Sequence, residues 1–294
     1  MDLDLAQLRA LSAAVTAGTL DAAATALHVT PSAVSQRLRA LEVATGRVLL
    51  IRSKPVRVTE SGEAVLRLAR QIELLTQDTA AELAEPSAAT RRTVAIAVNA
   101  DSLGTWVLPA LAPLAGEVCF DLHRADEQHT AALLRSGAVV AAITAEPDPV
   151  AGCSVTRLGS MRYRPMAAAA FSRSWFPDGA TSTALAAAPV VVFDRQDGLQ
   201  QAYLGPRLPA GVVPPVHYVP TTAEFRAAVG LGMGWGMLPD LQTAGDTGTD
   251  LVEVDADGAV DVTLHWQQWK LRSPSLDRTA SAVVAAARRQ LIQH

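Results

Sequence analysis

The chain has 294 residues, of which 49% are hydrophobic and 18% are charged, and its formal net charge is −4. This composition excludes a mainly disordered or collagen-like chain, and the length predicts about two domains. No apolar run approaches the roughly 18 residues of a membrane span, the acidic start at Asp2 and Asp4 is unlike a signal peptide, and two cysteines are too few for a disulfide framework, so we expect a soluble cytoplasmic protein.

Residues 8–46 predict three helices. Apolar residues recur at helical spacing over 8–15, and residues 20–27 form a short Ala-rich segment. A third helix is expected to begin at Pro31, because Thr30 can cap it and a proline at the first position loses no hydrogen bond. Gly46 is expected to end this helix.

The second and third of these helices form a predicted helix-turn-helix motif, since only residues 28–30 separate them. Val34, Leu38 and Leu41 give the third helix an apolar face, and its opposite face is polar. Such a helix fits the major groove, where Gln and Arg can pair with base edges while Ser and Thr mainly hold phosphates. The candidate DNA contacts here are Thr30, Pro31, Ser32, Ser35, Gln36, Arg37 and Arg39.

A β-hairpin with a basic tip is expected next. Apolar residues 48–51 are followed by the loop 52–57 and by Val58, and Arg52 and Lys54 are the candidate phosphate contacts of this wing. Residues 30–57 hold six Lys and Arg side chains against Glu42 alone, a local net charge of +5 in an acidic chain. A basic stripe of this kind indicates a small DNA-binding module. The alternative interpretation is a solvated charged face.

A long helix is predicted to start near Thr59 and Ser61 and to end before Pro86. Its apolar positions are almost those of a heptad seam, namely Val65, Leu68, Ile72, Leu75, Thr79 and Leu83. So narrow a stripe favours pairing with a second copy, because helices that bind operators occur in pairs. The alternative is that the stripe packs against its own chain.

From residue 92 onwards strands and helices alternate. Strands are expected over residues 93–98, 118–123, 138–144, 189–193, 216–219 and 260–269, and helices over 103–114, 131–136, 224–231 and 276–291. This alternation predicts an α/β domain with mostly parallel sheets, and its length fits two lobes that flank a cleft.

These motifs resemble those of a known family. Ala22-Ala23-Ala24 and the run Val29 to Leu38, followed by Leu41-Glu42, Gly46 and Leu49-Leu50, are similar to the DNA-binding domain of LysR-type transcriptional regulators. Thr59-Glu60-Ser61-Gly62 resembles the start of that family's linker helix. The segments 229–232 and 236–239 resemble the family's region where the chain crosses between lobes.

Finer features resemble the ArgP/LysG branch of that family, over residues 97–103, 105–106, 108–111, 189–194 and 264–266. This resemblance implies a regulator that senses lysine or arginine and controls amino-acid export or metabolism genes. It implies a homodimer or a dimer of dimers on double-stranded operator DNA, with RNA polymerase as a further partner. The pair Gly234-Trp235 and Gly104 depart from the branch's pattern.

The expected fold is α/β, with a winged helix-turn-helix and a long linker helix before a two-lobed effector domain like a type 2 periplasmic binding protein. The expected DNA-binding domain spans 1–60, the linker (dimerisation) helix 61–86, the hinge 87–91 and the effector domain 92–294. Within the last, lobe I is expected at about 92–162 and 263–294 and lobe II at about 163–262.

A basic amino acid would need hydroxyl donors for its carboxylate and acidic partners for its cations. Polar residues at or after predicted strand ends, and the start of the helix after residue 98, are the candidates, because ligands of open α/β sheets bind there. They are Asp101, Ser102, Thr105, Glu127, Thr144, Phe193, Asp194, Thr221 and Glu224. The alternatives are that Asp101 or Ser102 only caps a helix, that the other carboxylates lie on the surface, and that Phe193 belongs to the core.

No cofactor, metal or catalytic site is expected. The glycines of residues 230–236 follow a predicted helix rather than a strand, so they do not form a dinucleotide loop. The histidines and cysteines lack zinc spacing, no G-x-S-x-G elbow occurs, and Cys153 has only Arg157 nearby to activate it. The competing hypotheses are a regulator of another small effector and a two-lobed α/β enzyme with an accessory N-terminal domain.

Overall fold

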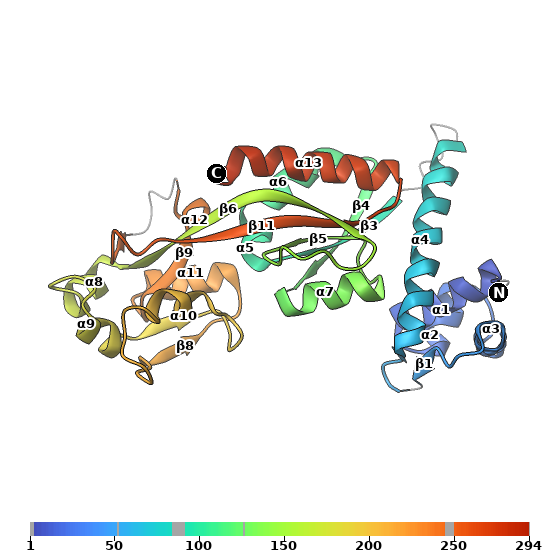
Figure 1. The fold of residues 1–294 in the computed structure, drawn as a ribbon, viewed down its shortest axis with the longest axis horizontal. Helices are drawn as coiled ribbons and strands as arrows, with labels where there is room; N and C mark the ends of the chain where they lie inside the picture. The colour runs from blue at the N-terminus through green and yellow to red at the C-terminus, as the bar shows by residue number, and fades with distance from the viewer. Residues whose placement is uncertain (1–2, 52, 84–91, 126, 245–249, 294) are drawn as a thin grey trace.

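The computed structural model describes residues 3–51, 53–83, 92–125, 127–244 and 250–293. The molecule is elongated, with the N-terminal helices at one end, a long helix standing beside them, and a curved sheet that reaches the other end (Figure 1). Among the described residues, no helix is both long enough and apolar enough to cross a membrane.

The N-terminal part contains α1 (Leu5–Ala17), α2 (Leu20–Ala26), α3 (Pro31–Thr45), β1 (Leu50–Ile51), β2 (Arg57–Val58) and α4 (Glu60–Leu83). Side-chain caps start the first three helices, because Asp4, Thr19 and Thr30 each accept a hydrogen bond from a backbone N–H of the first turn. Gly18 and Gly46 end α1 and α3 with the left-handed backbone that glycine adopts without strain.

The helices of the rest of the chain are α5 (Ala100–Ser102), η1 (Leu103–Val107), α6 (Leu108–Leu111), η2 (Ala112–Leu114), α7 (Glu127–Ser136), α8 (Ala169–Trp175), α9 (Ser182–Ala187), α10 (Leu199–Leu204), α11 (Thr222–Gly230), α12 (Asp240–Thr243) and α13 (Pro274–Gln290). The strands are β3 (Arg92–Val98), β4 (Val118–Arg124), β5 (Ala141–Thr144), β6 (Cys153–Ala168), β7 (Val190–Val192), β8 (Val216–Tyr218), β9 (Gly236–Pro239), β10 (Leu251–Glu253) and β11 (Val260–Trp269).

The main sheet has the order β10-β6-β11-β5-β3-β4, with β9 also paired to β6. Helices α13 and α6 lie on one side of it and α7 on the other (Figure 1). We call lobe I the part built from β3–β5, α5–α7 and α13, and lobe II the part built from β7–β10 and α8–α12. Strands β6 and β11 run between the two lobes, so they connect them twice.

The expectation of mostly parallel sheets is wrong. Among the strands that the structure describes, β3 with β4, β3 with β5 and β7 with β8 pair in parallel, whereas β6 and β11 pair antiparallel with each other and with their other neighbours. The long strand β6 was missed because its polar outward residues interrupt the apolar run. Residues 161–168 nevertheless alternate between buried and half-buried positions, which is the two-residue period of a strand.

Two predicted elements differ in detail. The helix expected over residues 103–114 is a continuous helical run that changes pitch, from the π-helical turn η1 through α6 to the 3₁₀ turn η2. Pro109 and Pro113 explain part of this, since neither can donate a hydrogen bond to the preceding turn. The strand expected over 138–144 is shorter, because β5 begins at Ala141.

Helix α4 contacts its own chain more than the heptad pattern predicts. Leu66 and Ala69 are buried in the core of the N-terminal domain, together with the partly buried Val65 and Ile72. Leu74, further along the helix, belongs to the core of the effector domain. The alternative of packing within the chain therefore holds for part of the helix. Three seam residues remain exposed: Leu68 (37%), Leu75 (38%) and Leu83 (81%).

Candidate functional site

The polar face of α3 is presented to solvent. Val34, Leu38 and Leu41 are buried against α1 and α2, which fixes the opposite face outward. Of the predicted DNA contacts, five are exposed and two are half-buried. The exposed ones are Thr30, Pro31, Ser32, Gln36 and Arg39, and the half-buried ones are Ser35 and Arg37.

The cap of α3 holds its first turn in place. Thr30 Oγ1 accepts from the Ala33 N–H at 3.2 Å, and the Thr30 and Ser32 hydroxyls lie 2.9 Å apart. Two hydroxyls at a helix N-terminus, where the dipole is positive, suit a phosphate oxygen.

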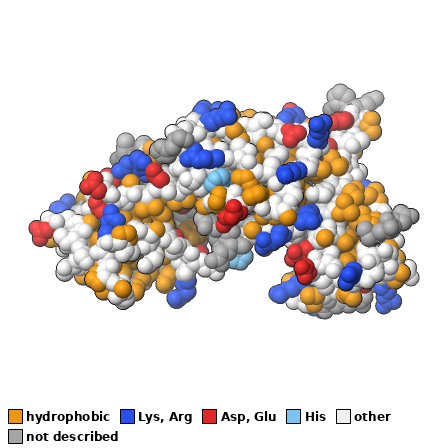
Figure 2. Space-filling model, in the orientation of Figure 1, with side chains coloured by type: hydrophobic (Ala, Val, Ile, Leu, Met, Phe, Trp, Pro, Cys, Tyr) orange, Lys and Arg blue, Asp and Glu red, His pale blue; other side chains and the backbone are white. Residues whose placement is uncertain are grey.

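The predicted wing is the antiparallel pair β1–β2, with Leu50 opposite Val58. Glu42 Oε1 accepts from the Leu49 N–H at 2.9 Å, so the one acidic residue of the basic stripe anchors the wing to α3. Lys54 is exposed in the loop between the strands, and Arg52 lies outside the described residues. Lys and Arg side chains lie along the outer surface of this domain (Figure 2).

The two lobes meet where β3 and β4 end. Arg124, the last residue of β4, donates to the Pro220 carbonyl oxygen at 3.0 Å, and its guanidinium carbon lies 5.7 Å from the centre of the Phe193 ring. A Cβ added to Gly104 would lie 3.3 Å from Thr222 Cγ2. The surface is hollowed between the lobes (Figure 2), so these contacts border a cleft at the carboxyl ends of the strands, as predicted for open α/β sheets.

Asp101 lies on the lobe I side of this cleft. Its Oδ2 accepts from the Tyr163 hydroxyl of β6 at 2.9 Å, and it does not cap a helix, because Asn99 occupies the cap position. Burial raises the pKa of the Asp101 carboxyl above its usual value, the Tyr163 hydrogen bond opposes that shift, and the charge of Asp197 adds to it. Asp101 and Asp197 are therefore within electrostatic reach of each other across the two lobes.

Of the hydroxyl residues predicted on lobe I, Ser102 and Thr144 are buried and Thr105 is half-buried. Ser102 is fully buried, and its Oγ has no hydrogen-bond partner among the described residues. The same holds for Asn99 Oδ1 and Trp106 Nε1. Thr105 Oγ1 donates to the Asp101 carbonyl oxygen, and Thr144 Oγ1 accepts from the Glu146 N–H. Three unpartnered polar atoms within eight residues need water or a ligand, since buried polar groups are almost always hydrogen-bonded.

The candidate effector residues of lobe II, and Glu127, differ from one another in exposure and in hydrogen bonding. Asp194 Oδ1 accepts from the N–H groups of Gln196 and Asp197, so it shapes the turn after β7. Glu224 is exposed, and the hydrogen bond from Thr221 holds the pKa of its carboxyl below the usual value. Glu127 begins α7, and its side chain lies outside the described residues.

Asp197 was missed by the sequence reasoning. Its two oxygens accept from the N–H groups of Leu199 and Phe193, and burial raises the pKa of its carboxyl. The signal was present, because Asp194 and Asp197 both follow a buried strand and Asp197 directly precedes α10. Arg124 was missed although it directly follows the strand predicted over residues 118–123.

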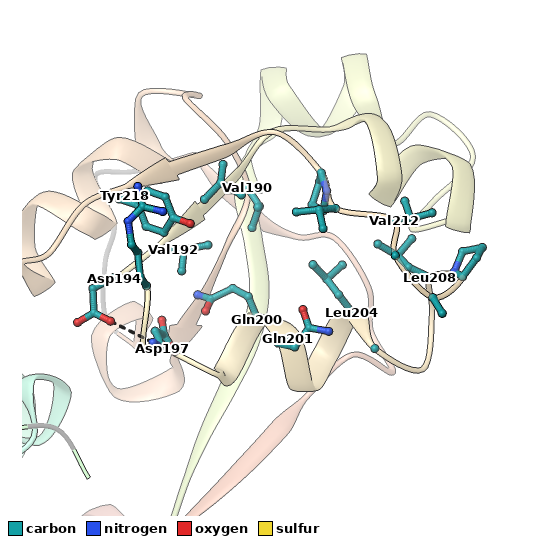
Figure 3. A pocket seen from close by; sticks show the side chains of 18 residues that line it. Val190, Val192, Asp194, Asp197, Gln200, Gln201, Leu204, Leu208, Val212 and Tyr218 are labelled. Atoms are coloured by element: carbon teal, nitrogen blue, oxygen red, sulfur yellow. Dashed lines mark hydrogen bonds between the residues drawn. The ribbon is translucent and has the colours of Figure 1, made fainter. Parts of the chain in front are cut away.

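Asp194 and Asp197 also border a pocket inside lobe II, with a volume of about 230 Å³. The two aspartates lie at one end, the side chain of Gln200 extends from α10 into the pocket, and Leu208 and Val212 lie at the other end (Figure 3). Gln200 is buried, and its Oε1 has no hydrogen-bond partner among the described residues. Of the predicted effector residues, only Asp194 lines this pocket.

The hypothesis of a reactive Cys153 is not supported by its surroundings. Cys153 is buried, and this burial raises the pKa of its thiol to about 11, so the thiolate is scarce at neutral pH. The glycines of residues 230–236 lie between α11 and β9, which is the reverse of the strand-to-helix order of a dinucleotide loop.

Comparison with known proteins identifies relatives over the whole chain. The profile of bacterial regulatory helix-turn-helix proteins of the lysR family matches residues 5–63, and the profile of the LysR substrate binding domain matches residues 87–291. The HTH-type transcriptional regulator LysG of Mycobacterium tuberculosis is 44% identical over 285 residues, which cover 97% of this chain and 94% of that protein.

Two solved structures are similar in fold. The crystal structure of ArgP from Mycobacterium tuberculosis has a TM-score of 0.88 and 43% identity, and the match covers 99% of both chains. Full-length LysG from Corynebacterium glutamicum with bound effector Arg has a TM-score of 0.78 and 37% identity, over 99% of this chain and 100% of that one. From its helix-turn-helix to its two-lobed domain, the chain thus belongs to the LysR family of bacterial regulatory helix-turn-helix proteins.

Proposed function

We propose that this regulator binds operator DNA with α3 in the major groove and the β1–β2 wing along the backbone. The observation that carries the proposal is the exposed polar face of α3 with its hydroxyl cap at Thr30 and Ser32. Gln36 and Arg39 would contact base edges, while Ser35, Arg37, Arg52 and Lys54 would hold phosphates or orient the helix.

The proposed assembly is a homodimer, or a dimer of dimers, paired along α4. Leu68, Leu75 and Leu83 are exposed on one stripe of the helix, and pairing would remove them from water. Two α3 helices related by a twofold axis would then reach successive major grooves of a pseudo-palindromic site. RNA polymerase is the proposed partner where the bound regulator activates transcription.

Lysine or arginine is the proposed effector, bound between the lobes. Support comes from the acids Asp101 and Asp197, since the charge of Asp197 acts on the Asp101 carboxyl, and from the unpartnered Ser102 Oγ. The acids would pair with the ligand's cationic groups, and Ser102 would donate to its carboxylate. Thr105 would join it only by rotating its hydroxyl away from the Asp101 carbonyl oxygen. The regulator LysG of Corynebacterium glutamicum, which has a similar fold, has been solved with arginine bound. The proposed targets are genes of amino-acid export or metabolism.

The domain boundaries that we propose are those expected from the sequence. The DNA-binding domain would be 1–60, the linker helix 61–86, the hinge 87–91 and the effector domain 92–294. Since its operator DNA is cytoplasmic, the protein would act there.

Calorimetry against the twenty amino acids tests the effector, and Ser102→Ala tests the site. We expect binding of lysine or arginine by the wild type, and weaker binding with unchanged operator affinity in the variant. Thr76→Ala, at an exposed position of α4, is the control. Binding of neither amino acid would contradict the proposed effector, and an unchanged affinity in Ser102→Ala would remove Ser102 from the site.

A further inference from the structure

A carboxylate is buried where the linker helix α4 meets the effector domain. Asp78, in the last turns of α4, is 3% exposed. Charged side chains are rarely buried so completely without partners, and both partners of Asp78 come from lobe I. Arg92 Nε lies 3.2 Å from Asp78 Oδ1 as an ion pair without hydrogen-bond geometry, and Ser273 Oγ donates to Asp78 Oδ2. Three separate elements, α4, β3 and the start of α13, therefore converge on one side chain.

Ser273 links this carboxylate to the body of lobe I. It caps α13, since its Oγ accepts from the Leu276 N–H at 3.3 Å. Helix α13 in turn packs against α6 and the π-helical turn η1. Because η1 includes Thr105 and directly follows Ser102, a shift of the cleft side of lobe I is passed to α13 through direct packing and reaches Asp78.

The other half of α4 is tied to the DNA-binding domain. Glu73 accepts from the Ser12 hydroxyl of α1 at 3.2 Å, and Arg70 Nη2 donates to Thr16 Oγ1 of α1 at 3.3 Å. Leu66 and Ala69 are buried in the core of that domain. One helix is thus built into two cores, and its angle to lobe I fixes where the DNA-binding domain lies.

The Asp78 cluster is suited to fixing that angle. Apolar contacts such as those of Leu74 are non-directional and tolerate rotation. The hydrogen bond from Ser273 is directional, and the charge of Asp78 is strongly unfavourable away from water if its pairing with Arg92 is lost. Rotating α4 on lobe I would break both contacts of Asp78 at once.

We propose that Asp78 is a positioning residue that transmits the effector signal from lobe I to the DNA-binding domain of the same chain, by holding α4 at a fixed angle through Arg92 and Ser273. This inference rests on the proposed function, since it requires an effector whose binding is sensed at the operator.

The first test is Asp78→Asn in the full-length protein. This change keeps the shape and an oxygen for Ser273 but removes the charge that pairs with Arg92. Calorimetry measures arginine affinity, and fluorescence measures operator affinity and operator bending with and without saturating arginine. We expect arginine affinity within about twofold of wild type and at least a fivefold loss of the arginine-induced change at the operator. Asp277→Asn, at an exposed position in the first turn of α13, should leave both unchanged.

The double variant Asp78→Leu with Arg92→Met separates signalling from stability. Replacing a buried ion pair by apolar side chains of similar size often keeps or raises stability, so we expect a thermal midpoint at or above the wild-type value with the operator response still lost. A response that returns together with stability would show that Asp78 is only structural and would overturn the proposal, as would a wild-type response in Asp78→Asn. A wild type that binds no arginine, or shows no arginine response at the operator, would overturn the proposed function and this inference together.

Discussion

Substituting Leu75 by lysine tests whether α4 is a dimerisation helix. Leu75 is 38% exposed in the single chain, so a lysine there can extend its ammonium group into water and leave the monomer folded. Its neighbour Leu74 is 3% exposed within the effector core, where the same change would unfold the chain. The two adjacent leucines therefore separate the effect on assembly from the effect on folding.

The size of the effect follows from the exposed area. An exposure of 38% leaves ~60 Å² of Leu75 to be buried in a dimer, worth ~1.5 kcal/mol per chain and ~3 kcal/mol per pair at ~25 cal/mol per Å². A loss of ~3 kcal/mol raises the dissociation constant on the order of 100-fold. Two facing ammonium groups add repulsion, so we expect monomers at micromolar protein concentration.

Sedimentation and light scattering measure the result, with Ala80→Lys as the matched control. Ala80 is exposed on the same helix but lies about a quarter of a turn from the seam, so this variant should remain dimeric. A Leu75→Lys protein that keeps the wild-type mass would refute pairing along this stripe.

Four further predictions address the DNA face and the cleft. Gln36→Ala should cost about 1–3 kcal/mol at the cognate operator in binding assays, and an equal loss on random DNA would contradict base contact. Lys54→Ala should lower the slope of log affinity against log salt by about 1, and an unchanged slope would exclude a phosphate contact. Gly104→Leu should push Thr222 away and weaken arginine binding in calorimetry, while Gly116→Leu, where an added Cβ meets nothing, should not; equal affinities would show that the lobes do not close there. Because burial raises the pKa of Asp101, a larger fraction of its carboxyl is protonated as the pH falls, and a bound cation then has to displace that proton. Arginine affinity should therefore decrease below neutral pH, and Asp101→Asn should flatten that dependence. A parallel decrease in the variant would assign the pH dependence to another group.

The DNA-binding domain could be predicted from the sequence because its signals are local. The caps Thr19 and Thr30, the terminal Gly46 and the periodicity of Val34, Leu38 and Leu41 all lie within a few residues of the elements that they define. The sheet could not be predicted in the same way. The pairing of β6 with β11 joins residues about a hundred positions apart, and no local pattern specifies which strands meet or in which direction.

The candidate site was predicted in part for a similar reason. The rule that ligands bind at strand ends led to Asp101 and Ser102, and the structure places a buried carboxyl and an unpartnered hydroxyl there; that they bind the effector stays a prediction. The same rule led to Asp194 but not to Asp197, because the roles of these two carboxylates depend on hydrogen bonds within a turn. Asp78 was missed because the heptad pattern considers only apolar residues, whereas the burial of this polar residue depends on Arg92 and Ser273 from other elements.

The distribution of charge explains why the link between the two sites has to be mechanical. In the proposed function, the DNA face carries the basic stripe and the cleft carries the acids Asp101 and Asp197. Lobe I and α4 lie between the N-terminal helices and lobe II (Figure 1). Helix α4 has 24 residues, which span ~36 Å at ~1.5 Å per residue. Exposed charges are screened within ~8 Å at physiological salt, so neutralising the cleft with a cation changes almost nothing in the field at the wing. A displacement carried by packed elements is not screened by salt, and α4, built into both cores, connects them.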